Sequence, residues 1–418
     1  MNVFRKNKIF RQLSLANVLS IAGDSLFYLA LVTYASQLKQ YSLIISIIAL
    51  LETLPNLLES LSGYFSDQTK YRFQWLIVSG FIRGILYCFV GILFASSWQA
   101  WLIICVTISI NFVSDCFGTF SNSLRIPIIR RICTNDELEE ALGLTNSFGQ
   151  IIRFIAQFLG AALLALVSYS GLAYLNAISF FLVSVIFLFI QKSMDTSSVA
   201  TNEEDGARKK IERQSYWHSL KKAINQIRYQ PKLFQMVFQV GIINGLLAAF
   251  LPLLQIIFVE KTKMIIGNYS FTVALTGAVL TLSLAMGSLF GVPLFKKVQL
   301  ATVVLCLNLF IIIFLISCFY ENFVVILSGL AIIGFLVGVS TPKLSGWLMT
   351  SVDSQQLAIS VGLINSILVM MAPLVMSIFS LISSFHRIQA LIIYLLLLSG
   401  GCLMLSYITN RKIGRAHV

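Results

Sequence analysis

The feature that most constrains this chain is a series of long windows without a charged residue. The second half contains six such windows, at 233–259, 264–295, 298–320, 322–342, 354–386 and 388–410. Each is longer than the roughly 20 residues that a helix needs to cross the hydrocarbon core of a bilayer. Because lipid cannot hydrogen-bond the backbone, each window must satisfy its own N–H and C=O groups, as a helix does. The windows therefore predict six membrane-spanning helices.

The first half is equally apolar but carries a few charges inside its apolar runs. We expect its spans near 13–36, 41–65, 74–97, 99–124, 141–168 and 171–191. Only 11% of the chain is charged and 57% is hydrophobic, whereas soluble domains are about 25% charged. A membrane β-barrel would show short alternating strands instead. The expected fold class is an all-α integral membrane protein with twelve transmembrane helices in two six-helix bundles.

A polar linker divides the two bundles. The stretch "DTSSVATNEEDGARKKIERQ" is the one long polar, mixed-charge segment, which is typical of a flexible connection. We expect an N-terminal bundle over 1–191, a cytoplasmic linker over 192–231 and a C-terminal bundle over 232–412. The end of the linker suits either an amphipathic surface helix or an ordinary connector. The last residues, "IGRAHV" (413–418), match what a sequencing adapter encodes, so we expect them to be an artefact.

Basic residues predict the orientation of the chain. With both termini in the cytoplasm, four of the 30 Lys and Arg residues fall outside (Lys39, Lys261, Lys263 and Arg387) and two lie within spans. This bias follows the positive-inside rule. The net charge of +13 is thereby explained as a topology signal, without a nucleic-acid partner. We expect a monomer in the bacterial cytoplasmic membrane, with the lipid bilayer as its surroundings.

Several chemistries lack a sequence signal. The seven cysteines form no CxxC pair and fall mostly inside predicted helices, so they indicate neither a metal site nor disulfides. The chain shows no nucleophile–base pair, metal-ligand spacing or phosphate-binding loop. We therefore expect no cofactor, no metal and no enzymatic activity.

A short internal repeat relates the two halves. "GLTNS" (143–147) returns as "GLINS" (362–366), and each copy opens the fifth predicted helix of its half. Equivalent positions in two six-helix halves indicate parallel structural repeats.

Six plus six helices, a charged linker and cytoplasmic termini resemble the major facilitator superfamily. The loop "GYFSDQTKYR" (63–72) is similar to its G-x-x-x-D-(R/K)-x-G-(R/K) signature. Gly63 and Asp67 match; the first base, second glycine and second base are replaced, and Arg72 supplies a charge one place later. The resemblance implies that Gly63, Asp67 and Arg72 form a gating loop with altered contacts.

Within that superfamily, two segments resemble the macrolide-efflux type drug:proton antiporters. The opening "FRQLSLANVLSIAGDSLFYLALV" carries a Gly-Asp pair in the first span, as those exporters often do. The segment "RFIAQFLGAALLA" (153–165) is a degraded version of the antiporters' fifth-helix GPxxGG motif. The resemblance implies a secondary active transporter that works by alternating access.

Charged residues inside the spans are candidate functional groups, because burying charge in a bilayer is costly and such groups face the bundle interior. Six occur, and all are in the first half: Asp24, Glu52, Glu59, Arg83, Asp115 and Arg153. Helical spacing places them on polar stripes of four helices. These stripes are Asn17, Ser20, Asp24 and Tyr28; Glu52, Asn56 and Glu59; Thr107, Asn111, Asp115 and Gly118; and Asn146, Gln150, Arg153 and Gln157.

Depth divides these charged residues into two groups. Asp24, Glu52 and Arg153 lie near the middle of their spans, and with Asn56 and Tyr28 we expect them to couple protons or bind substrate. Glu59, Arg83 and Asp115 lie nearer one end, where we expect one intramembrane charge cluster. A lone carboxylate among apolar neighbours can take up and release protons, because its charged form is disfavoured. Asp24, with Glu52 as partner, is the expected proton carrier.

Plainer structural roles stand beside these. The charge cluster could equally be a salt-bridge network that only holds helices together, and Glu52 could be a structural acid. Asp24 could hydrogen-bond a neighbouring helix or cap a kink after Gly23. The expected function is proton-coupled export of a small, cationic or amphipathic molecule. Alternatives are an exporter of lysophospholipids, siderophores or peptides, an uptake symporter, and a non-transporting immunity or sensor protein.

Overall fold

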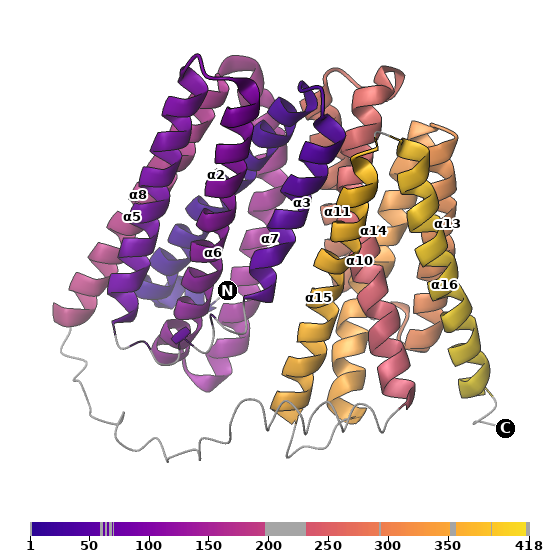
Figure 1. The fold of residues 1–418 in the computed structure, drawn as a ribbon. Coiled ribbons are helices and arrows are strands. Elements are labelled where there is room, and N and C mark those ends of the chain that lie inside the picture. The colour runs from indigo at the N-terminus through magenta and orange to yellow at the C-terminus, as the bar shows by residue number, and fades with distance from the viewer. Residues whose placement is uncertain are drawn as a thin grey trace. The chain divides into compact units, whose positions relative to one another are not determined.

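The computed structural model of the protein is all-helical (Figure 1). It describes residues 2–58, 62, 65–66, 69, 71–196, 231–291, 294–351, 357–385 and 387–414. Most of the expected linker, 197–230, lies outside the described residues. So do 415–418, while Ile413 and Gly414 belong to the last helix.

Among the described residues, the first half contains a helix in each of the six expected spans, preceded by a short one; α3 has 17 residues and the other five are longer. They are α1 (Asn2–Lys6), α2 (Lys8–Ser36), α3 (Tyr41–Leu57), α5 (Arg72–Ala95), α6 (Ala100–Ile132), α7 (Asn135–Leu166) and α8 (Tyr169–Thr196). Asn7 caps α2, since its side chain accepts a hydrogen bond from the N–H of Phe10. Helix α6 continues two turns past its expected end at residue 124, which brings additional polar residues into the bundle.

The second half repeats this arrangement. Its elements are α10 (Pro231–Glu260), η2 (Thr262–Met264), α11 (Tyr269–Met286), the π-helical turn η3 (Gly287–Gly291), α13 (Leu300–Phe319), α14 (Phe323–Ser351), α15 (Leu357–Ser383) and α16 (Ile388–Gly414). Within the described part of the chain, ten helices are long and apolar enough to cross a membrane, and Tyr41–Leu57 and Ile367–Ser383 are shorter apolar helices. The prediction of an all-helical membrane protein is confirmed.

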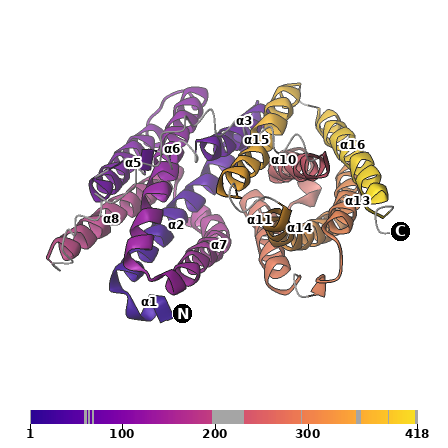
Figure 2. The same cartoon turned by 90° about the horizontal axis from the view of Figure 1, so that it is seen from below.

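The two halves share one packing pattern (Figure 2). In the first half, α2 packs against α7 and α8, and α5 packs against α6 and α8. In the second half, α10 packs against α15 and α16, and α13 packs against α14 and α16. If the long helices of each half are numbered in order, the first, third, fourth, fifth and sixth have equivalent packing partners in the two halves. The pattern supports the two structural repeats that the sequence indicated, and the repeated pentapeptide lies in the corresponding helices α7 and α15.

By proximity of Cα atoms, the chain divides into two compact units. They follow the two halves except that 42–53 is grouped with the second half and 267–275 with the first. Unit 1 holds 1–41, 54–203 and 267–275, and unit 2 holds 42–53, 204–266 and 276–418. Each unit is described by itself.

In unit 1, a glycine allows α2 to approach α8 closely. A Cβ atom at Gly23 would lie 2.2 Å from Asn176 Oδ1 and 2.3 Å from Ser179 Oγ, both on α8. These distances are far below van der Waals contact. The Gly-Asp pair of the sequence therefore has a packing reason: Gly23 permits the approach, and Asp24 is carried to the same level of the bundle.

Candidate functional site

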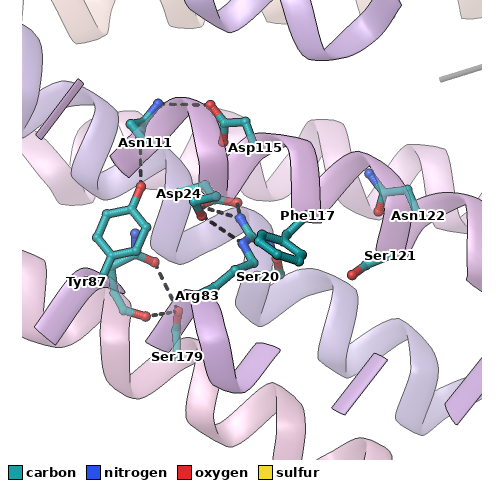
Figure 3. A network of polar contacts seen from close by, with 12 residues as sticks. Ser20, Asp24, Arg83, Tyr87, Asn111, Asp115, Phe117, Ser121, Asn122 and Ser179 are labelled. Carbon is teal, nitrogen blue, oxygen red and sulfur yellow. Dashed lines mark hydrogen bonds and ion pairs between the residues drawn. The ribbon is translucent and has the colours of Figure 1, made fainter. Parts of the chain in front are cut away.

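Arg83 lies at the centre of a polar network within unit 1 (Figure 3). It is on α5, is only 4% exposed and stacks on Phe180 of α8, with its guanidinium carbon 3.8 Å from the ring centroid. The next residue, Gly84, lets α5 lie this close to α8, because a Cβ there would lie 2.6 Å from the ring of Phe181. Packing of α5 against α8 thus buries a permanently charged side chain.

Every nitrogen of this guanidinium donates a hydrogen bond. Nε donates to Ser114 Oγ on α6 at 2.9 Å, and Nη1 donates to Ser20 Oγ on α2 at 3.2 Å. Nη2 donates to both carboxylate oxygens of Asp24, at 3.0 and 2.8 Å. Ser20 and Asp24 are one turn apart on α2, so they meet Arg83 together. Arg83 therefore joins three helices through one charged group.

The ion pair between Arg83 and Asp24 is a contact that the expected charge cluster did not include. The cluster of Glu59, Arg83 and Asp115 stays a prediction. Sequence reasoning grouped Arg83 with Glu59 and Asp115, whereas the structure pairs it with Asp24 at 2.8 Å. Glu59 lies outside the described residues. The physical reason is the rotation of α5: its polar side faces α2 and the serine of α6, which puts Arg83 at the level of Asp24. Depth counted from the span ends could not reveal that rotation.

Asp115 belongs to a neighbouring chain of hydrogen bonds (Figure 3). The hydroxyl of Tyr87 donates to Asn111 Oδ1 at 2.7 Å, and Asn111 Nδ2 donates to Asp115 Oδ2 at 2.9 Å. Tyr87 lies one turn after Arg83 on α5 and is 1% exposed. This chain links α5 to α6 and uses the stripe of Asn111 and Asp115 that helical spacing predicted.

Two adjoining cavities open beside the ion pair. The smaller one, of about 80 Å³, is lined by Asn17, Ser20, Ile21, Asp24, Ser25, Arg83, Gly118, Asn122, Arg125 and Arg153. The larger one, of about 590 Å³, is lined by Phe10, Leu13, Ser14, Asn17, Ile21, Asn122, Arg125, Ile126, Ile129, Thr145, Gly149, Gln150 and Arg153. Five residues line both, so the cavities form one polar-to-apolar hollow between α2, α6 and α7. Figure 3 shows Asn122 and Ser121 on α6, further along from Asp115.

Arg125 is a site residue that sequence reasoning missed. The expected span ended at residue 124, so Arg125 was counted with the cytoplasmic charges, but α6 continues to Ile132. Its guanidinium donates to the side-chain oxygens of Asn17 and Asn122. The signal was present, because Asp115, Gly118, Asn122 and Arg125 follow one another at helical spacing on one face.

The other predicted mid-span residues fall in different places. Arg153 lines both cavities and is exposed, as its stripe on α7 predicted. Tyr28 is half-buried, one turn beyond Asp24 on α2. Glu52 and Asn56 are exposed on α3, and Glu52 belongs to the segment grouped with unit 2. The partnership of Glu52 with Asp24 stays a prediction.

The expected gating loop is described only in part. Gly63 and Asp67 lie outside the described residues, while Arg72 begins α5. Arg72 Nε donates to the carbonyl of Ser66 at 3.4 Å, and Ser66 Oγ donates to the carbonyl of Ser123 on α6 at 3.0 Å. Arg72 therefore helps to hold Ser66 against α6.

Unit 2 contrasts with this charged site. Its buried polar side chains include a neutral chain in which Asn308 Nδ2 donates to Ser406 Oγ at 3.0 Å, and Ser406 Oγ donates to Gln239 Oε1 at 3.4 Å. These neutral hydrogen bonds join α10, α13 and α16. Among the residues that the structure describes, no group of three or more His, Cys, Asp or Glu side chains could hold a metal ion. The ion pair of Arg83 with Asp24 and the arginines that line the two cavities lie in unit 1.

Comparison with known proteins agrees with this architecture. The family model of the Major Facilitator Superfamily matches residues 13–377. The chain belongs to the Major Facilitator Superfamily. A search of curated proteins found no match by sequence. The chain is therefore a multi-pass membrane protein with the fold of this superfamily's transporters.

Solved transporters share the fold at low sequence identity. A point variant of the nucleoside transporter NupG has a TM-score of 0.73 and 10% identity, covering 97% of this chain and 99% of its own. A variant of the peptide transporter POT in complex with alafosfalin has a TM-score of 0.69 and 12% identity, covering 97% and 94%. A bacterial homologue of the human lysosomal transporter Spinster, inward-facing and occupied, has a TM-score of 0.62 and 12% identity, covering 98% and 97%.

Proposed function

We propose that this member of the superfamily is a secondary active transporter that exports amphipathic small molecules and couples their flux to protons through Asp24. In this proposal it works in a bacterial cytoplasmic membrane with both termini inside. The observation that carries the proposal is the unequal ion pair: Arg83 is buried, while the side chain of Asp24 is 33% exposed beside a cavity.

The pair suits a proton switch because only one partner can change its charge. Arginine stays protonated in proteins, so the positive charge of Arg83 is fixed. Asp24 is reached from the cavity, so a proton can arrive there. Protonation cancels the carboxylate and leaves the buried guanidinium without its counter-charge. A buried charge that loses its partner is strongly destabilised, so the protonated state favours a different arrangement of α2 against α5.

Such a difference between two protonation states is what coupling requires. A ligand shifts a conformational equilibrium only by its difference in affinity for the two states. A proton that binds Asp24 better in one arrangement therefore biases the bundle toward that arrangement. The serines at positions 20 and 114 accept the other two hydrogen bonds of the guanidinium and are neutral, so the switch rests on Asp24.

The first experiment identifies a transported compound. Cells with and without the protein are profiled against a panel of drugs and peptides that includes erythromycin, in the presence and absence of an uncoupler. Protection that the uncoupler abolishes supports a gradient-driven exporter. Sensitisation supports an uptake symporter, and protection that survives the uncoupler supports an immunity or sensor role.

The second experiment tests Asp24 in proteoliposomes under an imposed pH gradient, with the protecting compound and a pH dye. Asp24→Asn keeps the size of the side chain and one acceptor oxygen for Arg83 but removes the ionisable group. We expect gradient-driven flux and proton movement to be lost, while the protein is less stable but still folds. Glu260→Gln, an exposed acid at the end of α10, is the matched control and should behave as wild type. Coupled flux at the wild-type ratio in Asp24→Asn would contradict the proposal.

A further inference from the structure

Building on the transport function proposed above, we propose that Arg125 and Arg153 form an anion-binding subsite. It would take one carboxylate or phosphate group of an amphipathic substrate, whose hydrocarbon part lies against the apolar wall of the larger cavity. This reverses the charge expected from sequence, where an unpaired Asp24 suggested a cationic substrate.

The charge balance of the hollow carries the first step. Among the described residues, three guanidinium groups line the smaller cavity, from Arg83, Arg125 and Arg153, against the single carboxylate of Asp24. Because Asp24 is bonded to Arg83 at 2.8 Å, the cavity retains two positive charges. An electropositive hollow of this kind attracts an anion and repels a cation.

The hydrogen bonds of the two arginines carry the second step. Arg125 donates to the amide oxygens of Asn17 and Asn122 and to the carbonyl of Ser121, all of which are neutral. Arg153 makes no hydrogen bond or ion pair with any residue in the described parts of the chain. Charged side chains inside a membrane bundle are costly and are kept for function or pairing. The guanidinium fork matches a carboxylate or a phosphate in geometry as well as charge.

The shape of the larger cavity carries the third step. Its volume of about 590 Å³ lies within the range of roughly 300–1,000 Å³ that is usual for small-molecule sites. One wall is apolar, from Phe10, Leu13, Ile21, Ile126 and Ile129. The arginines and Gln150 are also in its lining, so the cavity offers both a charged and an apolar surface to one molecule.

A buried hydroxyl in the same cavity is an independent sign of a missing partner. Ser14 is 4% exposed and lines the larger cavity, and its Oγ finds no hydrogen-bond partner among the described residues. Buried polar atoms are almost always paired in folded proteins. A bound polar group in the cavity would satisfy Ser14.

The test is a binding measurement without a gradient. Wild-type protein in nanodiscs of neutral phosphatidylcholine is titrated by calorimetry at neutral pH with octanoate, octyl phosphate, octylammonium and inorganic phosphate, with empty nanodiscs subtracted. We expect the two anionic amphiphiles to bind at least about tenfold more tightly than octylammonium, and inorganic phosphate to bind more weakly than octyl phosphate. Equal or tighter binding of octylammonium would overturn the proposal.

Three variants separate binding from folding. Arg153→Gln removes a guanidinium that makes no bond in the described structure, so the fold should survive and octyl phosphate affinity should fall about tenfold. Arg153→Lys should recover part of that loss. Arg130→Gln is the matched control, because Arg130 is exposed on α6 and lines neither cavity. An equal loss in Arg130→Gln, or no loss in Arg153→Gln, would overturn the subsite.

Competition distinguishes a lipid headgroup from a free organic acid as the source of the anion. Displacement of octyl phosphate by lauroyl lysophosphatidylglycerol supports a lipid substrate, and displacement by a short dicarboxylate supports an organic acid. Displacement by neither would overturn the subsite. Asp24→Asn should still bind octyl phosphate, so a failure of proton coupling and a failure of anion binding give different results.

Discussion

Arg83 Nη2 lies 2.8 Å from Asp24 Oδ2 and 3.0 Å from Asp24 Oδ1, which joins α5 to α2 across 59 positions of the sequence. The two side chains differ in exposure, at 5% for Arg83 and 33% for Asp24. Arg83 has further partners on α2 and α6, whereas Asp24 is open to the cavity. One member of the pair is therefore held on several sides, and the other faces the cavity.

The energy of this pair can be measured by a double-mutant cycle. Arg83→Gln leaves Asp24 without its counter-charge, and we expect it to lower the free energy of unfolding by about 2 kcal/mol. That value lies below the roughly 3–5 kcal/mol of a fully buried pair, because a third of Asp24 is exposed. Arg83→Gln combined with Asp24→Asn should be less destabilised than the sum of the single variants. Thermal unfolding in detergent measures all four proteins, and additive effects would contradict an energetic pair.

The close approach of α2 to α8 is tested at Gly23. Gly23→Ala places a Cβ atom 2.2 Å from Asn176 Oδ1, and overpacking of this kind costs about 1–3 kcal/mol. We expect a lower Tm and a weakened ion pair, because Asp24 is the next residue. Gly400→Ala is the matched control, since a Cβ there meets nothing within 4 Å. Alanine favours helix, so that control should match wild type or gain up to about 1 kcal/mol.

For the hydrogen bonds that link Tyr87 through Asn111 to Asp115, we expect a smaller effect on stability. Tyr87→Phe removes the donor to Asn111 Oδ1, which lies 2.7 Å away, and the loss of one such hydrogen bond costs about 1 kcal/mol. The phenyl ring keeps the edge contact with Phe27, whose centroid is 4.9 Å away. Tyr320→Phe serves as control, since Tyr320 is 78% exposed. A Tyr87→Phe protein as stable as that control would show that the hydrogen bond contributes nothing.

A pH-dependent contribution is expected at the end of α10. Lys261 Nζ lies 2.6 Å from Glu321 Oε1, and this carboxylate raises the pKa of Lys261, first by hydrogen bonding and then by its charge. A raised pKa in the folded state gives stability that is fully present below the unfolded lysine value of about 10.4. That stability is lost as pH rises through the higher folded value.

Glu321→Gln tests this linkage. The Tm difference between wild type and variant should be present near pH 8. It should vanish as the pH rises above the pKa of free lysine and through the higher pKa of Lys261 in the folded protein. High salt should reduce the difference at pH 8, because both side chains are substantially exposed. A difference that persists unchanged at high pH would show that it does not arise from the charge of Lys261.

Sequence reasoning located the spans well because charge is excluded from hydrocarbon. The charge-free windows predicted α10 to α16, and the helical stripe of Asn17, Ser20 and Asp24 predicted residues that do line one cavity. The shared pentapeptide placed α7 and α15 as equivalents, in keeping with the repeated packing pattern. These features depend on local composition and helical period, which a sequence displays directly.

Sequence reasoning failed where the rotation and continuation of a helix decided the contact. The pairing of Arg83 with Asp24 was missed, because the facing of the Arg83 side chain toward α2 follows from the packing of α5 on α8. Arg125 was placed outside the bundle, because polar residues after position 124 do not end α6. The sequence also presented Asp24 as a carboxylate without a partner, because its partner Arg83 is visible only in three dimensions.

The sequence by itself determined that this chain spans a membrane, that its spans form two related sets of six, and that its intramembrane charges lie in the first set. Hydrophobicity and helical period fix those properties, because the bilayer acts on each segment separately. Only the tertiary structure decided that Arg83 neutralises Asp24 and that Arg125 and Arg153 face one hollow. Partner choice depends on distances of a few ångströms between side chains on different helices, and those distances are set by the packing of whole helices against one another.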